Sequence, residues 1–299
     1  MTRSRIVDAL QAGRILVSDG AWGTFLQKKG LKPGECPEAW CLTRPGDVAD
    51  IGRSYVEAGA DLIETNSFGA TPLKLAHYGL ADRAAEINEA AARLSREAAG
   101  PDRWVIASMG PTGRMLLLGD VSESELFDAF AVQARALARG GADGLCIETF
   151  SALDEAALAI RAARETACEV LCTFTFERTV KGEYRTMMGV SPAEAAVAAR
   201  DAGAHVVGTN CGNGMERMVD IVREMRAAAP GTPILVHANA GLPVRVGGAD
   251  VFPETPEEMA ARVPALVAAG AHIIGGCCGT TPAHIAALRQ AVDALPPRA

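Results

Sequence analysis

Two adjacent cysteines near the end of the sequence have the residue type and the setting of metal ligands. Cys277 and Cys278 lie in the stretch GGCCGTTPAHI, where small neighbours leave the backbone unencumbered. A third cysteine, Cys211 in DAGAHVVGTNCG, follows its Gly-Ala pair at the distance at which Cys278 follows the pair in AAGAHIIGGCCG. Three thiolates suit Zn²⁺, and three protein ligands leave its fourth position open, as in catalytic zinc sites. We therefore predict a catalytic zinc site at Cys211, Cys277 and Cys278.

The other cysteines show no such arrangement. Cysteine is among the most buried residue types, so an isolated one is more often part of the core than a ligand. We interpret five of them in this way: Cys36, Cys41, Cys146, Cys168 and Cys172. A sulfur-rich zinc site with an open position binds a further thiol and deprotonates it. The predicted chemistry is therefore alkyl transfer to a thiol rather than hydrolysis.

Eight short apolar runs must supply the scaffold for these cysteines. Four of them follow a Gly-Ala turn, and the other four are RILVSDG, WVIASMG, VLCTFTF and ILVHANAG. Continuous runs of Val, Ile and Leu are typical of parallel strands that are covered on both faces. Helical segments separate the runs, and three begin with capping-box patterns, at Ser122, Ser191 and Thr255. This alternation predicts an α/β protein with a single (β/α)₈ TIM-barrel domain over residues 1–299.

A doubly wound open sheet is the alternative fold. No Gly-x-Gly-x-x-Gly follows the first strand, which argues against a dinucleotide-binding sheet. In a barrel, the functional groups lie where the strands end. Polar residues occur there at Asp19, 64–66, Ser108, Glu148, 173–175, Asn210 and Asn239. Long loops are expected around the same rim at 20–46, 110–121 and 240–254, where they would shape a pocket or a docking surface.

Composition excludes several classes of partner. The net charge is −7, the pI is about 5.4, and no block of Lys and Arg occurs, so nucleic acid and anionic membranes are not expected partners. The first twenty residues lack the apolar core of a signal peptide, and no apolar run approaches the length of a membrane span. We therefore expect a cytoplasmic protein with reduced thiols.

Seven motifs in a fixed order make the chain resemble a known family. They are DGAWGT, GADLIETNSF, GPTGRM, IETFSALDEA, TNCG, NAGLP and GGCCGTTPAHI, between residues 19 and 285. The chain resembles the homocysteine S-methyltransferase family over almost its whole length, and most closely the homocysteine-binding modules of the cobalamin-dependent members. The resemblance implies a barrel in which Cys211, Cys277 and Cys278 hold zinc and a methyl group is moved to the thiol of homocysteine, giving methionine.

The resemblance also suggests Asn239, in the motif NAG, as a replaceable oxygen ligand of the zinc when substrate is absent. An Asn at the end of the seventh strand, between the strands that carry the cysteines, is well placed for that role. His237 lies two residues earlier and therefore faces the same side one layer deeper. We interpret it as a satisfied interior histidine.

The ammonium and carboxylate of homocysteine need partners of their own. Glu148, which ends the fourth strand across the barrel from the eighth, is the first choice to meet the ammonium, and Asp19 is the second. Both positions match the amino-acid pocket of the family. Backbone N–H groups of the glycine-rich DGAWGT and of the next strand end are expected to hold the carboxylate, the latter at Thr65, Asn66 and Ser67.

The family resemblance leaves three classes of methyl donor to consider. Members of the family use methylcobalamin, S-methylmethionine or glycine betaine, and Gly279 after the cysteine pair is typical of cobalamin-dependent modules. The chain contains no Asp-x-His-x-x-Gly cobalamin motif, so methylcobalamin is expected to arrive on a separate corrinoid protein. A sulfonium donor or betaine used by the chain alone remains open, the latter with a cage from Trp22, Trp40 and Tyr78. A non-catalytic zinc protein that binds thiols is the alternative from another class.

Overall fold

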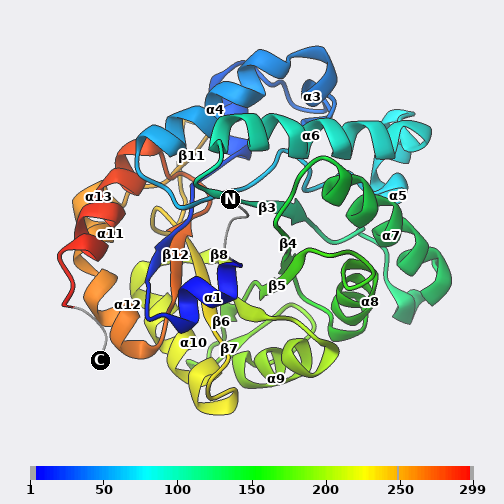
Figure 1. The fold of residues 1–299 in the computed structure, drawn as a ribbon. Coiled ribbons are helices and arrows are strands. Elements are labelled where there is room, and N and C mark those ends of the chain that lie inside the picture. Colours follow the sequence, from blue (N-terminus) through cyan, green and yellow to red (C-terminus); the bar gives the residue numbers. More distant parts are fainter. Residues whose placement is uncertain (1–4, 248, 297–299) are drawn as a thin grey trace.

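The computed structural model describes residues 5–247 and 249–296, in which the eight predicted strands form one parallel sheet closed into a barrel (Figure 1). The sheet order is β1-β12-β9-β8-β5-β4-β3-β2, and a bridge between Ser18 and Leu62 joins the two end strands. The strands are β1 (Leu16–Val17), β2 (Leu62–Ile63), β3 (Trp104–Met109), β4 (Gly144–Phe150), β5 (Glu169–Phe174), β8 (Val206–Gly214), β9 (Ile234–Asn239) and β12 (Ile273–Gly276). The predicted (β/α)₈ barrel is confirmed, although residues 1–4, 248 and 297–299 of the predicted domain lie outside the described residues.

Helices surround the barrel and fill most of the connections between its strands (Figure 1). They are α1 (Ile6–Gln11), α2 (Gly23–Lys28), α3 (Trp40–Thr43), α4 (Pro45–Glu57), α5 (Pro72–Leu75), α6 (Ala84–Ala99), α7 (Glu123–Arg139), α8 (Leu153–Ala163), α9 (Pro192–Ala202), α10 (Met215–Ala228), α11 (Pro256–Ala261), α12 (Val263–Ala269) and α13 (Pro282–Asp293). Short 3₁₀ turns lie at Ala76–Tyr78, Ala81–Arg83 and Leu116–Leu118. Within the described part of the chain, no helix is both long enough and apolar enough to span a membrane.

The three predicted capping boxes begin helices α7, α9 and α11. In each, the hydroxyl of Ser122, Ser191 or Thr255 accepts a hydrogen bond from the backbone N–H three residues later. The glutamate at that later position accepts from the backbone N–H of the capping residue in return. These local bonds satisfy donors that the first helical turn leaves free, so the sequence defines the helix starts independently of the barrel.

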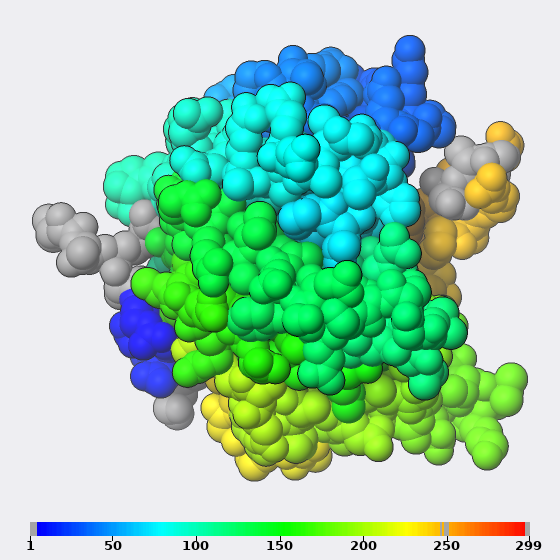
Figure 2. Space-filling model, turned by 90° about the vertical axis from the view of Figure 1, so that its right-hand side faces the viewer, coloured from blue at the N-terminus to red at the C-terminus, as the bar shows by residue number. Residues whose placement is uncertain are grey.

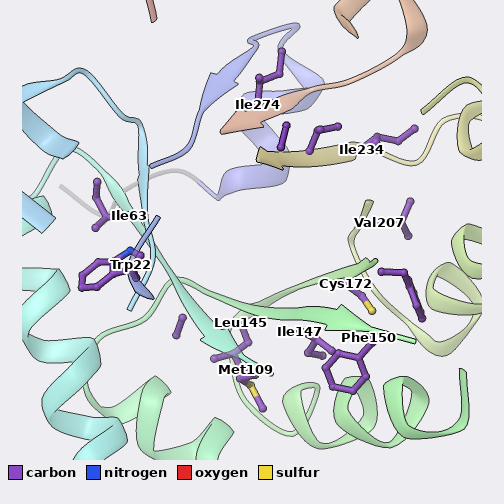
Figure 3. Close-up of a cluster of buried hydrophobic side chains, with 14 of the residues drawn as sticks. Trp22, Ile63, Met109, Leu145, Ile147, Phe150, Cys172, Val207, Ile234 and Ile274 are labelled. Carbon is purple, nitrogen blue, oxygen red and sulfur yellow. The ribbon is translucent and has the colours of Figure 1, made fainter. Parts of the chain in front are cut away.

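Alternation along the strands sorts their apolar side chains into two layers. One cluster includes Leu145 and Ile147 and lies between strands and helices, where Figure 3 shows side chains from several strands. The intervening Cys146 belongs to a second cluster, which also contains Leu10 of α1. Because side chains of a strand point alternately to its two faces, the second cluster is the interior of the barrel. Helix α1 packs against this interior layer.

The interior positions become polar toward the carboxyl ends of the strands. On β4, Glu148 stands two residues beyond the apolar interior residue Cys146, and on β9, His237 stands two beyond Leu235. Other strands follow the same pattern, with Glu64 two residues beyond Leu62 and Ser108 two beyond Ile106. Every second residue of a strand faces the interior of the barrel, and these positions change from apolar to polar toward the carboxyl end of the strand, at the top of the barrel.

The loops at this rim contain more structure than the sequence predicts. The expected loop at 20–46 contains the short helices α2 and α3, and that at 240–254 contains the hairpin β10 (Val244–Val246) and β11 (Ala249–Val251). Residue 248 within it lies outside the described residues. A further hairpin, β6 (Glu177–Arg178) and β7 (Tyr184–Arg185), follows β5 and was not predicted. Figure 2 shows the hairpin near residue 180 (yellow-green) and the segment near 250 (gold) projecting from one side of the molecule, opposite α1 (blue).

Candidate active site

The structure brings the three predicted cysteine ligands to one point at the top of the barrel. Cys211 lies in β8, and Cys277 and Cys278 follow β12 directly, with β9 between the two strands. The Sγ atoms of Cys211 and Cys278 are 3.9 Å apart, and all three sulfurs lie within 4.8 Å of one another. The three sulfur atoms therefore lie as close together as the Gly-Ala repeat of the sequence predicts.

Glycines allow the chain to place two adjacent thiols here. A Cβ atom at Gly275 would lie 2.7 Å from the Cβ of Ser18, and one at Gly276 would lie 2.3 Å from the Oγ1 of Thr280. Both positions therefore exclude any larger residue. Gly279, which ends the pair, has a φ of +82°, a conformation that glycine adopts without steric cost. Close packing before the pair and a left-handed turn after it together fix the direction of the two cysteines.

The thiols influence one another electrostatically. Hydrogen bonds from Cys277 and Cys278 lower the pKa of the Cys211 thiol well below its ordinary value. The pKa values of Cys277 and Cys278 are raised in turn, first of all by their contact with Cys211. Asn239 contacts Cys211 through its side chain, and its buried side-chain oxygen has no hydrogen-bond partner among the described residues. Three sulfur donors and one free amide oxygen match the donor set expected for Zn²⁺.

A cavity of about 280 Å³ opens directly beside the cysteines. All three of them line it, as do Glu148 and Trp22. Three further predicted substrate contacts, in the segment that follows β2, also line it: Thr65, Asn66 and Ser67. The cavity thus has a wall of sulfur and walls of carboxylate and backbone polar groups.

The carboxylate wall also contains two residues for which no contact with a substrate was predicted. Glu64 and His237 lie with Glu148 in a group whose nearest ligand atoms are all within 4.8 Å of one another. Glu148 accepts a hydrogen bond from the Ser108 hydroxyl, and burial still raises its pKa to about 7. Burial and the neighbouring carboxyls also raise the pKa of Glu64 well above its ordinary value. The period of two that places Glu148 inside the barrel is the signal that would have identified Glu64 as well.

Asp19 lies beneath this wall and is fully buried. Its Oδ2 atom accepts hydrogen bonds from the indole N–H of Trp22, at 2.9 Å, and from the backbone N–H of Glu64, at 2.8 Å. Burial raises its pKa to about 7 despite these bonds. Among the described residues that line the cavity Asp19 does not appear, so it supports the pocket wall through Trp22 and Glu64.

The end of β2 is held by hydroxyl groups. The Ser67 hydroxyl donates to the backbone oxygen of Ser108 at 2.7 Å, and the Thr65 hydroxyl accepts from the backbone N–H of Ser108 at 3.0 Å. The Asn66 amide donates to the backbone oxygen of Pro37 at 2.8 Å. These side chains are therefore occupied with structural bonds, so that mainly backbone groups are left to contact a ligand at this edge.

His237 lies in the interior, as predicted, but it is not satisfied. Its Nδ1 atom is 3.4 Å from a carboxylate oxygen of Glu64, and its Nε2 atom has no hydrogen-bond partner among the described residues. Burial lowers its pKa to about 4. A neutral imidazole therefore lines the cavity beside Glu64 and Glu148.

The other candidate groups do not assemble at the cavity. Of the three aromatic residues considered for a betaine cage, Trp22 lines the cavity, whereas Trp40 is packed under Arg44 and Tyr78 is exposed. The five cysteines interpreted as core residues are buried or partly buried, and none of them lies in the cavity lining that the structure describes. Burial raises the pKa of Cys36 to about 12, consistent with an inert thiol.

Comparison with known proteins agrees with this geometry. A model of the family described as homocysteine S-methyltransferase matches residues 16–292. A methionine synthase of Mycobacterium tuberculosis is 35% identical over 295 residues, which cover 93% of this chain and 25% of that protein. A methionine synthase of Mycobacterium leprae is 34% identical over 297 residues, covering 94% and 24%. The chain therefore spans about a quarter of the length of these relatives.

Solved structures show the same fold. The metallated form of the homocysteine methyltransferase MmuM from Escherichia coli superposes with a TM-score of 0.77 at 24% identity, covering 95% of this chain and 98% of that one. Its oxidized form gives 0.75 at 25% identity, covering 96% and 99%. The family match and the shared fold thus agree with the arrangement of cysteines and carboxylates in the cavity.

Proposed function

This chain belongs to the homocysteine S-methyltransferase family, and we propose that it transfers a methyl group to the thiol of homocysteine to give methionine. One observation carries the proposal: three cysteine sulfurs within 4.8 Å of one another share a cavity with buried carboxylates. Homocysteine is a small molecule with a thiol at one end and an ammonium and a carboxylate at the other. A cavity with soft sulfur ligands on one wall and anionic groups on another is complementary to it.

Cys211, Cys277 and Cys278 would hold a zinc ion, and Asn239 has a free oxygen with which to complete the site without substrate. When bound, zinc supplies a deprotonated, nucleophilic substrate thiol at neutral pH. The thiol proton would be released to solvent on binding, so the chain needs no general base near the sulfur. The task left to the protein is to bind and orient the amino-acid end of the substrate.

Glu148 is placed to meet the substrate ammonium. It lines the cavity, it is held by Ser108, and Glu64 stands beside it. Burial raises the pKa of these carboxyl groups because ionisation in the interior is costly. A bound cation offsets that cost, so such groups bind a cation favourably. Asp19 contributes by fixing the backbone of Glu64, and the backbone at 65–67 receives the carboxylate.

For the donor we propose methylcobalamin carried by a separate corrinoid protein. Support comes from Gly279 after the cysteine pair, as in cobalamin-dependent members, and from the similarity to two methionine synthases. The betaine alternative loses support because Trp40 and Tyr78 do not reach the cavity. A sulfonium donor such as S-methylmethionine is distinguished by experiment.

The test is a side-by-side assay of zinc-loaded protein with homocysteine and three donors: methylcobalamin, S-methylmethionine and betaine. We expect methionine to form slowly from free methylcobalamin and faster when a methylated corrinoid protein is added. Rapid, saturable turnover with S-methylmethionine alone would replace the donor while keeping the activity. Binding of homocysteine without methionine from any donor would identify a thiol-binding protein instead.

A further inference from the structure

Two residues at the rim have a backbone conformation that their side chains disfavour. Thr149 has a φ of +66° and Cys211 a φ of +57°, and they are the only non-glycine residues with positive φ among those the structure describes. For a β-branched residue such as threonine this region is a genuine outlier. Thr149 directly follows Glu148, and Cys211 is one of the three clustered cysteines. Such backbone strain persists only where the surrounding structure holds it.

Both residues belong to bulges at the ends of their strands. Between Ile147 and Phe150, strand β4 has one residue more than its neighbour β5. Between Asn210 and Gly214, strand β8 has two residues more than β9. Bulges change the direction of side chains and leave backbone groups without ladder partners. The bulge in β4 therefore contains Glu148, which alternation along the strand already directs into the barrel, and it leaves the N–H of Thr149 without a partner in the ladder.

The side chain of Asn210 satisfies this bulge from the other side of β5. Its Oδ1 accepts hydrogen bonds from the backbone N–H of Thr149, at 2.8 Å, and from the hydroxyl of Thr173, at 2.7 Å. Its Nδ2 donates to the hydroxyl of Thr149 at 2.7 Å. A primary amide alone among the common side chains offers an acceptor and a donor in this spacing. Asn210 is completely buried and does not line the cavity that the described residues form.

We propose that Asn210 is a positioning residue, which holds Glu148 in the cavity by clamping the left-handed turn at Thr149 and joins this turn to the adjacent cysteine of the metal site. The inference rests on the proposed role of Glu148 toward the ammonium of homocysteine. The backbone oxygen of Asn210 also accepts a hydrogen bond from the hydroxyl of Thr175, at 2.8 Å, so Asn210 is anchored to the residue that follows β5 as well. One buried amide thus connects the turn beside Glu148, the proposed contact of the substrate ammonium, to Cys211 of the proposed zinc site.

The proposal predicts a specific rescue. Without the amide, Thr149 relaxes from its disfavoured conformation and carries Glu148 away, whereas glycine at position 149 keeps the turn without a clamp. Asn210→Ala should therefore weaken homocysteine binding about tenfold but 4-mercaptobutanoate, which lacks the amino group, by no more than about twofold. Zinc content should stay near that of the wild type. In a Thr149→Gly background, Asn210→Ala should cost less than about threefold.

The experiment measures dissociation constants of both thiols and zinc per chain for zinc-loaded wild type, Asn210→Ala, Thr149→Gly and the double variant. Asn213→Ala is the matched control, because this buried residue of the same strand donates to Phe176 at 2.7 Å and not to Thr149. Equal losses for the two thiols, or an undiminished loss in the Thr149→Gly background, would overturn the proposal. A double variant that does not fold would also contradict it, since Asn210 would then support the barrel through other contacts.

Two further measurements separate this inference from the proposed function. Hydrogen exchange of the Thr149 amide should accelerate in Asn210→Ala whatever the substrate is, and unchanged exchange would refute the clamp. Glu148→Gln reports on the ammonium alone. If it weakens both thiols equally while the exchange result holds, the proposed role of Glu148 fails and the clamp at Thr149 stands.

Discussion

Each of the three clustered cysteines is expected to be needed for zinc, because two remaining thiols bind the ion much more weakly than three. Cys278→Ser should lose most of its zinc after dialysis, and the barrel should stay folded because the site lies on the rim. The measurement is zinc per chain together with the far-UV circular dichroism spectrum. Cys168→Ser is the control, since that thiol donates to the backbone oxygen of Ala142 at 3.3 Å and does not line the cysteine cavity among the described residues. A full complement of zinc in Cys278→Ser would contradict the metal assignment.

Glu148 is expected to read the ammonium and nothing else of the substrate. Glu148→Gln keeps the shape of the side chain and an acceptor for Ser108, but it removes the charge. Homocysteine binding should weaken by about tenfold to a hundredfold, the range for a hydrogen bond to a charged group. Binding of 4-mercaptobutanoate and zinc content should change little. The measurement is calorimetric titration of zinc-loaded protein, and equal losses for the two thiols would show that the carboxylate serves another purpose.

The same carboxyl group should make the protein without substrate less stable as the pH rises. Burial raises the pKa of Glu148 from 4.5 to about 7. Between these values the folded chain binds more protons than the unfolded chain, so the free energy of unfolding falls with increasing pH. A shift of this size corresponds to at most about 3 kcal/mol. Glu148→Gln should therefore be more stable than the wild type at pH 8, by about 1–3 kcal/mol, and by much less at pH 5.

Urea unfolding of the zinc-loaded proteins at the two pH values measures this difference. Comparison of variant with wild type cancels the contributions of the titrating groups that do not interact with Glu148, whereas Glu64 and Asp19 lose its repulsion in the variant. A wild type that matches the variant at both pH values would show that Glu148 does not change its charge in this window. If the difference is found, ionised Glu148 destabilises the protein without substrate, and the substrate ammonium would offset that cost on binding.

At the scale of elements, the turn after the cysteine pair depends on close packing as well as on glycine conformation. Gly279 and Gly189 share a φ of +82°. A Cβ atom added at Gly279 would lie 2.3 Å from the Cβ of Phe252, whereas one added at Gly189 would have no described neighbouring atom within 4 Å. Gly189→Ala should cost about 1–2 kcal/mol from the left-handed backbone alone. Gly279→Ala should cost about 1–3 kcal/mol more, from overpacking, and should weaken zinc binding. Urea unfolding and zinc retention measure both effects, and equal costs would exclude the packing argument.

The elements that the sequence predicts are those with local signals. Apolar runs define all eight barrel strands, and the pattern Ser122-x-x-Glu125 marks the start of α7 because a capping box is local. The hairpin of β6 and β7 was missed because each strand has only two residues, too few to show an alternation of apolar and polar side chains. Helices α2 and α3, of six and four residues, are too short to leave a periodic pattern.

The candidate site divides in the same way. The repeat places Cys211 and Cys278 at equivalent strand ends, so their meeting could be inferred without coordinates. The left-handed conformation of Thr149 could not, because threonine gives no signal for positive φ. The hydrogen bond between the N–H of Thr149 and the side chain of Asn210 depends on a bulge in β4. No residue pattern in β4 or in β8 predicts that bulge. Contacts between strands that are distant in sequence are therefore the part that only the structure supplies.

For the molecule as a whole, exposed apolar residues gather on the loops of the functional rim. They include Leu117, Leu118, Val180, Met187, Leu242 and Val244. A second cavity, of about 210 Å³, is lined by Leu117 and Met187, and it shares Thr149 with the cavity that holds the cysteines. Exposed apolar surface that continues into a site is typical of protein interaction. The proposed corrinoid protein would have to approach over these loops in order to bring its methyl group to the sulfur.

This arrangement predicts that charge on the rim affects one donor and spares the other. Met187 is 82% exposed, so Met187→Glu should not disturb folding, but it places a charge where an apolar partner surface would be buried. Methyl transfer from a methylated corrinoid protein should slow by about tenfold or more. Transfer from free methylcobalamin and binding of homocysteine should stay unchanged, because Met187 does not line the cysteine cavity in the described structure. Val132→Glu, on α7 and away from the rim, is the control. Rates measured with both donors decide the matter: an equal loss for both would mean that Met187 shapes the cavity rather than a docking surface, and no loss for either would place the partner elsewhere.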